Sequence, residues 1–231
     1  NDPKRIFNST KGLVEKFGIE RVFDIPTSEN ALMGVSIGLA MSGMKPIYMH
    51  QRLDFFLLAM DQLINGASKW HYMIGGKVNL PITVRLIIGR GWGQGPTHSQ
   101  NLHAWFAHVP GLRVVMPSTV ADARDLLVAS VLCKDPVIYI DDRWLYEQEE
   151  NLPKIIELDL KTQKPKITSK GKDVTIIASG YSSYLARQAK DRLRKVNINP
   201  EIGINNNIKV IFPCLLKRFI APLKIFIRKL K

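Results

Sequence analysis

The stretch Val22-Phe-Asp-Ile-Pro-Thr-Ser-Glu-Asn-Ala-Leu-Met-Gly-Val-Ser-Ile-Gly38 decides the fold, because it sets one carboxylate, Glu29, between a predicted strand and a predicted helix. Residues 21–25 are expected to form a short strand that Pro26 ends, and the following Thr-Ser pair is typical of a helix start. The helix is predicted over residues 29–41. Because its apolar residues lie on nearly every face, we expect it to be buried, with Glu29 in its first turn.

A carboxylate in the first turn of a helix has an ordinary structural role. It complements the positive end of the helix dipole, which contributes about 0.3–1 kcal/mol. The alternative is a chemical role, because a buried, hydrogen-bonded carboxylic acid can share a proton with a ligand. The position of Glu29 alone favours the structural role.

Strand patterns alternate with helical patterns along the rest of the chain, which predicts an α/β fold with a mostly parallel sheet flanked by helices. The run Ile-Thr-Val-Arg-Leu-Ile-Ile at residues 82–88 is typical of a central strand that is buried on both faces. Further strands are predicted at residues 45–49, 112–116, 136–140 and 173–178. Further helices are predicted at residues 55–70, 97–109, 120–132 and 182–194.

Length and composition place the chain among ordinary globular proteins. Its 231 residues, 45% apolar and 23% charged, suffice for one or two domains with a sizeable core. No membrane-spanning helix and no signal segment are expected, because no run of eighteen apolar residues is present and the N-terminus is polar. Two cysteines, Cys133 and Cys214, are too few for a disulfide framework. We therefore expect a cytoplasmic location, or the mitochondrial matrix or a plastid in a eukaryote.

The formal net charge of +13 is concentrated at the C-terminus, where residues 205–231 carry seven Lys or Arg and no acid, leaving +6 for the first 204 residues. A basic chain is a candidate for nucleic-acid binding. Here most of the excess lies in the tail and the remainder shows no nucleic-acid-binding module, so no nucleic-acid partner is expected. The tail would suit an anionic membrane surface. Its sequence favours a non-native C-terminus instead, and membrane binding is not expected.

Short motifs follow the opening stretch in a fixed order. The pattern D-x-P-x-x-E at Asp24 to Glu29 precedes a glycine-containing helix, and further blocks lie at residues 60–65 (MDQLIN), 72–76 (YMIGG), 98–100 (HSQ), 108–115 (HVPGLRVV) and 135–137 (DPV). Over about residues 21–146 these blocks resemble the pyrimidine-binding domain of the β subunits of thiamine-diphosphate-dependent 2-oxo acid dehydrogenases, of the pyruvate and branched-chain type. Several blocks in the same order carry far more weight than any one of them.

The resemblance implies a particular domain organisation. A transketolase-like pyrimidine-binding domain is expected at residues 1–150, followed by a linker at residues 151–170. Residues 171–204 resemble the truncated start of a transketolase C-terminal-like α/β domain. Residues 205–231 form an atypical basic tail that replaces recognisable family sequence.

The resemblance also assigns chemistry to four residues. Glu29 stands where the family has the glutamate that contacts the aminopyrimidine ring of the cofactor. Phe55 stands where the family stacks an aromatic ring on that pyrimidine, and Gln51 where it lines the pocket with Gln or Met. His98 follows a glycine-rich loop at residues 89–95 and stands near the substrate and the acyl intermediate, where a histidine can shuttle a proton.

The implied function is that of the β subunit of a 2-oxo acid dehydrogenase, which decarboxylates a 2-oxo acid, with pyruvate favoured, and passes the acyl group to a lipoyl group. The implied cofactor is thiamine diphosphate. The resemblance also implies that a partner α subunit holds the diphosphate and its Mg²⁺ through a motif of the G-D-G…N type, and this sequence contains no such motif. The implied partners are this α subunit, in an α2β2-type assembly, a lipoyl acyltransferase and the 2-oxo acid substrate.

Structural roles alone would account for the other three residues as well as for Glu29. Core packing would explain Phe55, a solvated loop would explain Gln51, and a helix-capping or surface position would explain His98. For the whole chain, the alternatives are a transketolase-like fragment that acts on sugar phosphates and a catalytically inactive remnant. The motifs at residues 98–100 and 108–112 favour the dehydrogenase over the transketolase-like fragment, whereas the atypical tail favours the remnant.

Overall fold

The apolar run at residues 82–88 folds into β2 (Thr83–Ile88), an inner strand of a four-stranded parallel sheet. In the computed structural model, which describes residues 9–208, this sheet has the order β1-β2-β4-β3. The other strands are β1 (Ile47–His50), β3 (Arg113–Val115) and β4 (Val137–Asp142). Because all pairs are parallel, the carboxyl ends of the strands meet at one edge of the sheet. The predicted α/β fold class is confirmed.

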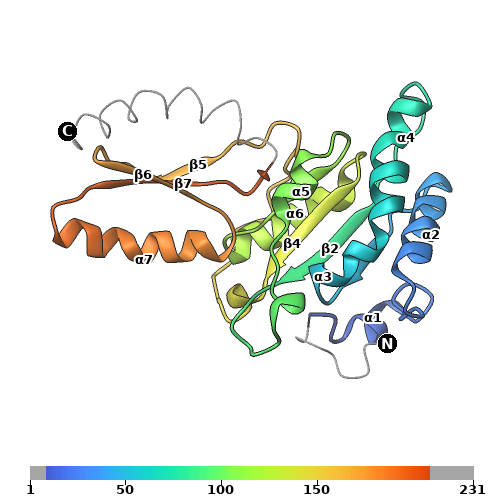
Figure 1. Ribbon diagram of the computed structural model, residues 1–231, viewed down its shortest axis with the longest axis horizontal. Helices are drawn as coiled ribbons and strands as arrows, with labels where there is room; N and C mark the ends of the chain where they lie inside the picture. The colour runs from blue at the N-terminus through green and yellow to red at the C-terminus, as the bar shows by residue number, and fades with distance from the viewer. Residues whose placement is uncertain (1–8, 209–231) are drawn as a thin grey trace.

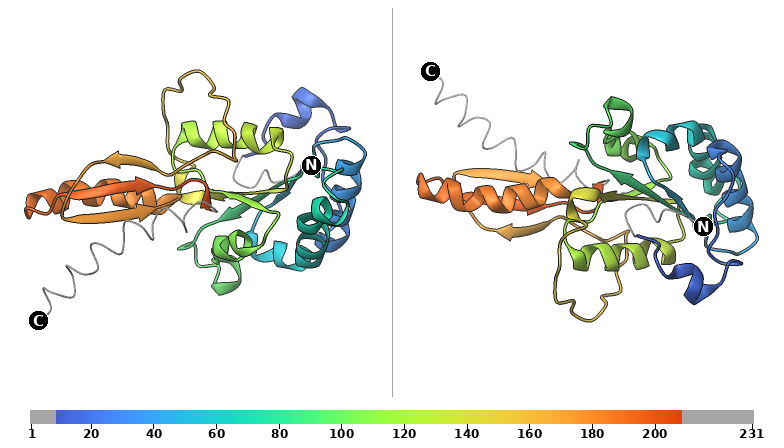
Figure 2. Two further views of the ribbon diagram at one scale, coloured as in Figure 1. Left: turned by 90° about the horizontal axis from the view of Figure 1, so that it is seen from above. Right: turned by 90° about the horizontal axis from the view of Figure 1, so that it is seen from below.

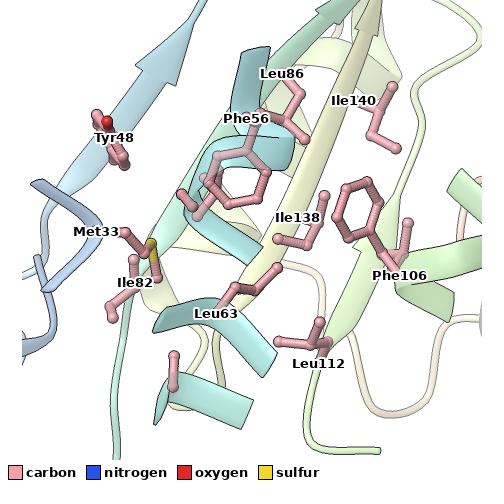
Figure 3. Close-up of a cluster of buried hydrophobic side chains, with 14 of the residues drawn as sticks. Met33, Tyr48, Phe56, Leu63, Ile82, Leu86, Phe106, Leu112, Ile138 and Ile140 are labelled. Atoms are coloured by element: carbon pink, nitrogen blue, oxygen red, sulfur yellow. The ribbon is translucent and has the colours of Figure 1, made fainter. Parts of the chain in front are cut away.

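One face of the sheet carries the main apolar core. Alternate residues of the inner strands, among them Leu86 and Ile138, point to this face. The helices that cover it contribute Phe56, Leu63 and Phe106, which fill the space above the strands and are 0% exposed (Figure 3). The side chains of this core set the distance between the covering helices and the sheet.

The opposite face is covered by α6 (Val120–Leu132), which lies across the sheet from α3 and α4 (Figure 2). Here Val137 and Tyr139 pack against Leu126 of α6. The Tyr139 hydroxyl donates a hydrogen bond of 2.8 Å to the carbonyl oxygen of Ala123. With helices on both faces, the first lobe is a three-layer α/β/α arrangement. The helix predicted at residues 120–132 is confirmed with the same bounds. Thr119 caps its N-terminus, since the Thr119 hydroxyl oxygen accepts a hydrogen bond from the Asp122 N–H.

The helices on the main face follow the predictions in part. Helix α2 (Glu29–Met41) has the predicted bounds. The predicted helix at residues 55–70 is a series of shorter helical segments: α3 (Leu53–Phe56), the 3₁₀ turn η2 (Leu57–Ala59), the π-helical η3 (Gln62–Ala67) and α4 (Ser68–Met73). The predicted helix at residues 97–109 is helical only in the 3₁₀ turn η4 (Pro96–His98) and in α5 (His103–His108).

Two predictions about the opening stretch are wrong. Residues 21–25 form no strand, and Phe23 is 55% exposed, because among residues 9–208 β1 is the outer strand on that side and pairs with no strand beyond it. Alternating apolar residues do not make a strand without a neighbour to satisfy the backbone. Helix α2 is buried on one face only, since Ile37 lies in the core while Val35 on the other side is 54% exposed.

A second lobe follows the first in sequence and extends away from it (Figure 1). Its three-stranded sheet has the order β5-β7-β6 and is formed by β5 (Lys166–Ser169), β6 (Val174–Ala178) and β7 (Pro200–Ile204). Helix α7 (Tyr181–Lys195) packs against β6 and β7. The strand predicted at residues 173–178 and the helix predicted at 182–194 are confirmed. Strands β5 and β7 were not predicted, and β5 lies inside the segment expected to be a linker.

After β7 the chain returns to the first lobe. The Asn206 carbonyl oxygen accepts a hydrogen bond of 2.9 Å from the Met116 N–H, and the Asn207 side chain donates one of 2.9 Å to the Leu160 carbonyl oxygen. Ile208 is buried in the main core. Residues 205–208 therefore fasten the second lobe to the first. The rest of the predicted basic tail, residues 209–231, lies outside the described residues.

Two short elements complete the description, α1 (Leu13–Phe17) and the 3₁₀ turn η5 (Arg143–Leu145). Between residues 9 and 208, no helix has both the length and the apolar character that crossing a membrane requires.

The main core makes a direct prediction about stability. Leu63→Ala should lower the free energy of unfolding by about 2–5 kcal/mol, because it removes a fully buried side chain from the space between helix and sheet. Leu58→Ala, only five positions away, is the control, since Leu58 is 65% exposed and its loss should change the free energy of unfolding by less than about 1 kcal/mol. Urea unfolding followed by circular dichroism measures both. Equal losses in the two variants would contradict the packing described here.

Candidate active site

The carboxyl edge of the first sheet gathers the loops that follow three adjacent strands. Gln51 and Arg52 follow β1, the glycine-rich loop at residues 89–95 follows β2, and η5 follows β4. Ligands of open α/β sheets bind outside the carboxyl ends of the strands. The predicted site residues all belong to this edge or to helix α2 beside it.

Glu29 begins α2 and is half-buried. The hydroxyl of Tyr48, on β1, donates a hydrogen bond of 3.4 Å to the backbone carbonyl oxygen of Glu29. Burial raises the pKa of Tyr48 to about 12, and the negative charge of Glu29 adds to this rise, so the hydroxyl keeps its proton and remains a donor. The N-terminus of α2, and with it Glu29, is thereby tied to the edge strand.

His50 supports Tyr48 from the same face of β1. Its ring lies 4.2 Å from that of Tyr48 and 4.9 Å from that of Phe56, in edge-to-face contacts at both. The side chain is buried, and its Nε2 atom has no hydrogen-bond partner. Burial lowers the pKa of His50 to about 4, so the imidazole is neutral at physiological pH. A column of three rings therefore connects the anchor of Glu29 with the main core.

Phe55 and His98 are brought together although 43 residues separate them. Their ring centroids are 5.2 Å apart and the ring planes meet at 87°, an edge-to-face contact. Phe55 is 43% exposed, so its ring combines a contact to His98 with an open surface. Gln51 is also exposed, four residues before Phe55 at the same edge. Within residues 9–208 no hydrogen bond joins Glu29 to Phe55, Gln51 or His98, so Glu29 approaches the edge separately, through Tyr48.

The glycine-rich loop is held by aromatic and cationic side chains. The guanidinium of Arg143 lies 4.2 Å from the ring centroid of Trp92, and Trp92 packs on Trp144 with centroids 4.8 Å apart. The Trp144 indole N–H donates a hydrogen bond of 3.0 Å to the Arg90 carbonyl oxygen. Gly89 has a φ of 149°, and a Cβ there would lie 2.5 Å from the Trp92 ring, so this tight start of the loop requires glycine.

This geometry agrees with the comparison with protein families, in which residues 6–148 match the family described as "Transketolase, pyrimidine binding domain". The chain belongs to this family. The pyrimidine-binding domain is thus the first lobe, and its carboxyl edge holds the candidate site.

The curated relatives of this chain include dehydrogenase β subunits. The pyruvate dehydrogenase E1 component subunit beta of Rhizobium meliloti (strain 1021) is 39% identical over 85% of this chain and 43% of its own length. The 2-oxoisovalerate dehydrogenase subunit beta of Bacillus subtilis (strain 168) is 38% identical over 90% of this chain and 63% of its own length. The chain therefore spans about half the length of the curated relatives it matches.

A solved structure supports the fold alone. A protein titled "Split gene transketolase, inactive beta4 tetramer" superposes with a TM-score of 0.72 at 21% identity, and the match covers 90% of this chain and 63% of that one. Because the match extends beyond the pyrimidine-binding domain, it includes much of the second lobe.

Sequence reasoning missed the residues that hold the predicted ones in place in the pyrimidine-binding domain. The shared position of Tyr48 and His50 could have been predicted, because side chains two residues apart in a strand point to the same face. Arg143 directly follows a strand that was predicted, but the sequence carries no signal for its contact with Trp92. For Arg52 and Asp54, nothing in the sequence indicates their partners. Among residues 9–208, no three His, Cys, Asp or Glu side chains are grouped as metal ligands.

The buried His50 of the pyrimidine-binding domain predicts how stability depends on pH. An unfolded histidine takes up a proton near pH 6.5, whereas folded His50 resists it until about pH 4. Its contribution is therefore complete above pH 6.5 and is lost as the pH falls toward 4, by about 2 kcal/mol at pH 5. Urea unfolding at pH 7.5 and at pH 5 measures this loss.

The His50→Phe variant should lose less stability between these two pH values than the wild type, because phenylalanine does not titrate. His108→Phe is the matched control at an exposed histidine and should keep the wild-type dependence. A His50→Phe variant that retains the full pH dependence would show that other groups cause it.

Proposed function

We propose that the chain is the β half of a thiamine-diphosphate-dependent 2-oxo acid dehydrogenase component, which acts on pyruvate and delivers the acyl group to a lipoyl group. The observation that carries this proposal is the carboxyl edge of the pyrimidine-binding domain. There, a helix-terminal glutamate anchored by Tyr48 accompanies an exposed aromatic ring in contact with a histidine. The relatives named as pyruvate and 2-oxoisovalerate dehydrogenase β subunits support the same reaction class.

The residues present fit an aminopyrimidine ring. Such a ring needs a flat apolar neighbour and a carboxyl group that reaches one of its nitrogens. Phe55 offers an open ring surface, and half-buried Glu29 offers the carboxyl group. Gln51, exposed four residues before Phe55, would line the same site with its amide. When bound, thiamine diphosphate would supply a nucleophilic thiazolium carbon and a cationic ring that accepts the electron pair released on decarboxylation.

Glu29 is the proposed acid–base residue of this chain. Its carboxyl group would share a proton with a pyrimidine ring nitrogen, which promotes proton movement at the opposite amino group. The position of the carboxyl group depends on the backbone of α2, which the Tyr48 hydroxyl holds. Because the pKa of Tyr48 is raised, this hydrogen bond persists through the physiological pH range.

His98 is the proposed residue on the substrate side. An imidazole in that position can donate a hydrogen bond to a developing negative charge, or take up a proton as the acyl group moves on. Its Nδ1 atom lies 3.2 Å from the hydroxyl of Thr97, which leaves Nε2 to face a ligand. The edge-to-face contact with Phe55 keeps the imidazole next to the pyrimidine-stacking surface.

The proposed partner that completes the site is an α subunit, in a heterotetramer of two α and two β subunits. The α subunit would hold the diphosphate and its Mg²⁺, and a lipoyl acyltransferase would receive the acyl group. The exposure of Phe55 and Gln51 supports a site that a second chain closes. We place the reaction in the cytoplasm, or in the matrix or plastid of a eukaryote, and the free Cys133 is compatible with such a reducing compartment.

The test is Glu29→Gln in a complex reconstituted with a cognate α subunit. Calorimetry should detect binding of thiamine diphosphate with Mg²⁺ by the wild-type mixture and not by the β chain alone. The variant should bind the cofactor within about tenfold of the wild type but lose at least about a hundredfold in turnover of pyruvate, because it keeps the shape of the side chain and loses its proton.

Glu20→Gln, at an exposed glutamate of the same N-terminal region, is the control and should keep wild-type turnover. Wild-type turnover in Glu29→Gln would refute the proposed role of this residue. A folded wild-type chain that binds no thiamine diphosphate with its α subunit would identify it as an inactive remnant.

A further inference from the structure

The segment that begins α3 reaches the glycine-rich loop and the His98 segment at two separate points. Arg52 and Asp54 lie two residues apart, directly before Phe55. Arg52 contacts Gln94, at the end of the glycine-rich loop, and Asp54 contacts Gln100, two residues after His98. In sequence, His98 lies between Gln94 and Gln100, and Phe55 directly follows Asp54.

Asp54 holds Gln100 through one carboxylate oxygen. Its Oδ1 atom accepts a hydrogen bond of 3.3 Å from the Gln100 backbone N–H and one of 2.8 Å from the Gln100 side-chain amide. The side chain is 9% exposed, so water competes little for these bonds. Charge-assisted hydrogen bonds of this kind are about twice as strong as neutral ones. Asp54 thus fixes both the backbone and the side chain of Gln100.

Arg52 holds the other end of the segment. One guanidinium nitrogen donates a hydrogen bond to the Gln94 side-chain oxygen, and another donates one of 3.3 Å to the Gln51 carbonyl oxygen. The side chain is 5% exposed. Burial and the positive charge of Arg143 lower the pKa of Arg52, and the negative charge of Asp54 acts against them. The Arg52 guanidinium and the Asp54 carboxylate are therefore coupled electrostatically.

The segment between the two contact points is shaped by local bonds. Its regular structure is the three-residue turn η4, and the bonds from the Ser99 hydroxyl to the Gly95 carbonyl oxygen and between Thr97 and His98 stay within the segment. Such bonds shape the turn but do not set its distance from α3. The hydrogen bonds that cross this gap come from Arg52 and Asp54, on either side of the ring contact between Phe55 and His98.

We propose that Arg52 and Asp54 form a two-point clamp that positions His98 against Phe55. The inference rests on the proposed function for its catalytic meaning, since His98 is the proposed substrate-side residue. Arg52 and Asp54 are positioning residues: they act through Gln94 and Gln100 on the placement of the imidazole. A displacement of about 1 Å at such a group can cost about a hundredfold in rate, so the clamp determines how well His98 works.

The first experiment measures the placement of His98 without any assay of activity. The ring current of Phe55 shifts the imidazole proton resonances of His98, which NMR detects in the full chain carrying ¹³C-labelled histidine. Phe55→Leu defines the resonance position without the ring. Asp54→Ala should move the His98 resonances toward that position, whereas Asp54→Asn should leave them in place, because asparagine keeps the accepting Oδ1 atom.

The control variants make the result specific. Asp191→Ala removes an exposed aspartate of α7 and should leave the His98 resonances unchanged. Gln100→Ala should reproduce the shift of Asp54→Ala, and the double variant should shift them no further, because both substitutions break the same bonds. Gln94→Ala should move the resonances in the same direction by removing the other end of the clamp.

The second experiment measures turnover in the reconstituted complex. Asp54→Ala should lower kcat by about tenfold to a hundredfold with the Kd for thiamine diphosphate unchanged, and Asp54→Asn should restore most of kcat. Unmoved His98 resonances in Asp54→Ala, or a loss of turnover that the asparagine variant does not rescue, would overturn the clamp. The predicted resonance shifts in a chain whose wild-type complex shows no turnover would uphold the clamp and refute the proposed function instead.

Discussion

The parallel register of β1, β2 and β4 is the constraint on which the rest of the structure depends. Ile47, Thr83 and Val137 lie side by side, so the three strands start in step, and β2 and β4 end together two residues beyond the end of β1. The segments that follow them, which carry Gln51, the glycine-rich loop and Arg143, must therefore emerge at one edge. No single segment makes the site, because each supplies only one part of it. The two apolar cores, one on each face, keep the sheet in the register that brings these parts together.

Glu29 and His98 are held at this edge by different kinds of interaction. Glu29 depends on packing, since Tyr48 anchors its backbone and His50 and Phe56 continue the contact into the core. His98 depends on its ring contact with Phe55 and on the polar contacts of the loop residues on either side of it. The proposed cofactor-side residue is thus fixed from the core, whereas the proposed substrate-side residue is fixed from the loop residues around it.

The sequence predicted the elements whose signals are local and missed those that depend on distant partners. Helices 29–41 and 120–132 follow clear start signals and have the predicted bounds. Residues 21–25 alternate like a strand but have no neighbour, whereas β5 and β7 pair Lys166 with Ile204 across 38 residues. The resemblance supplied Glu29, Gln51, Phe55 and His98 as candidates. The contacts of Arg52 and Asp54 span 42 and 46 residues, so periodicity could not reveal them.

The exposure of the site follows from the way the lobe is built. Helix α2 covers the sheet with one face and presents Val35 to solvent, and the ring of Phe55 is similarly uncovered. Reactions that pass through carbanion-like states need water excluded, because water protonates such states and weakens every electrostatic contact. Since this edge leaves its aromatic surface open, the proposed reaction needs a closing wall from outside the first lobe. The proposed α subunit would supply this wall together with the diphosphate-binding residues.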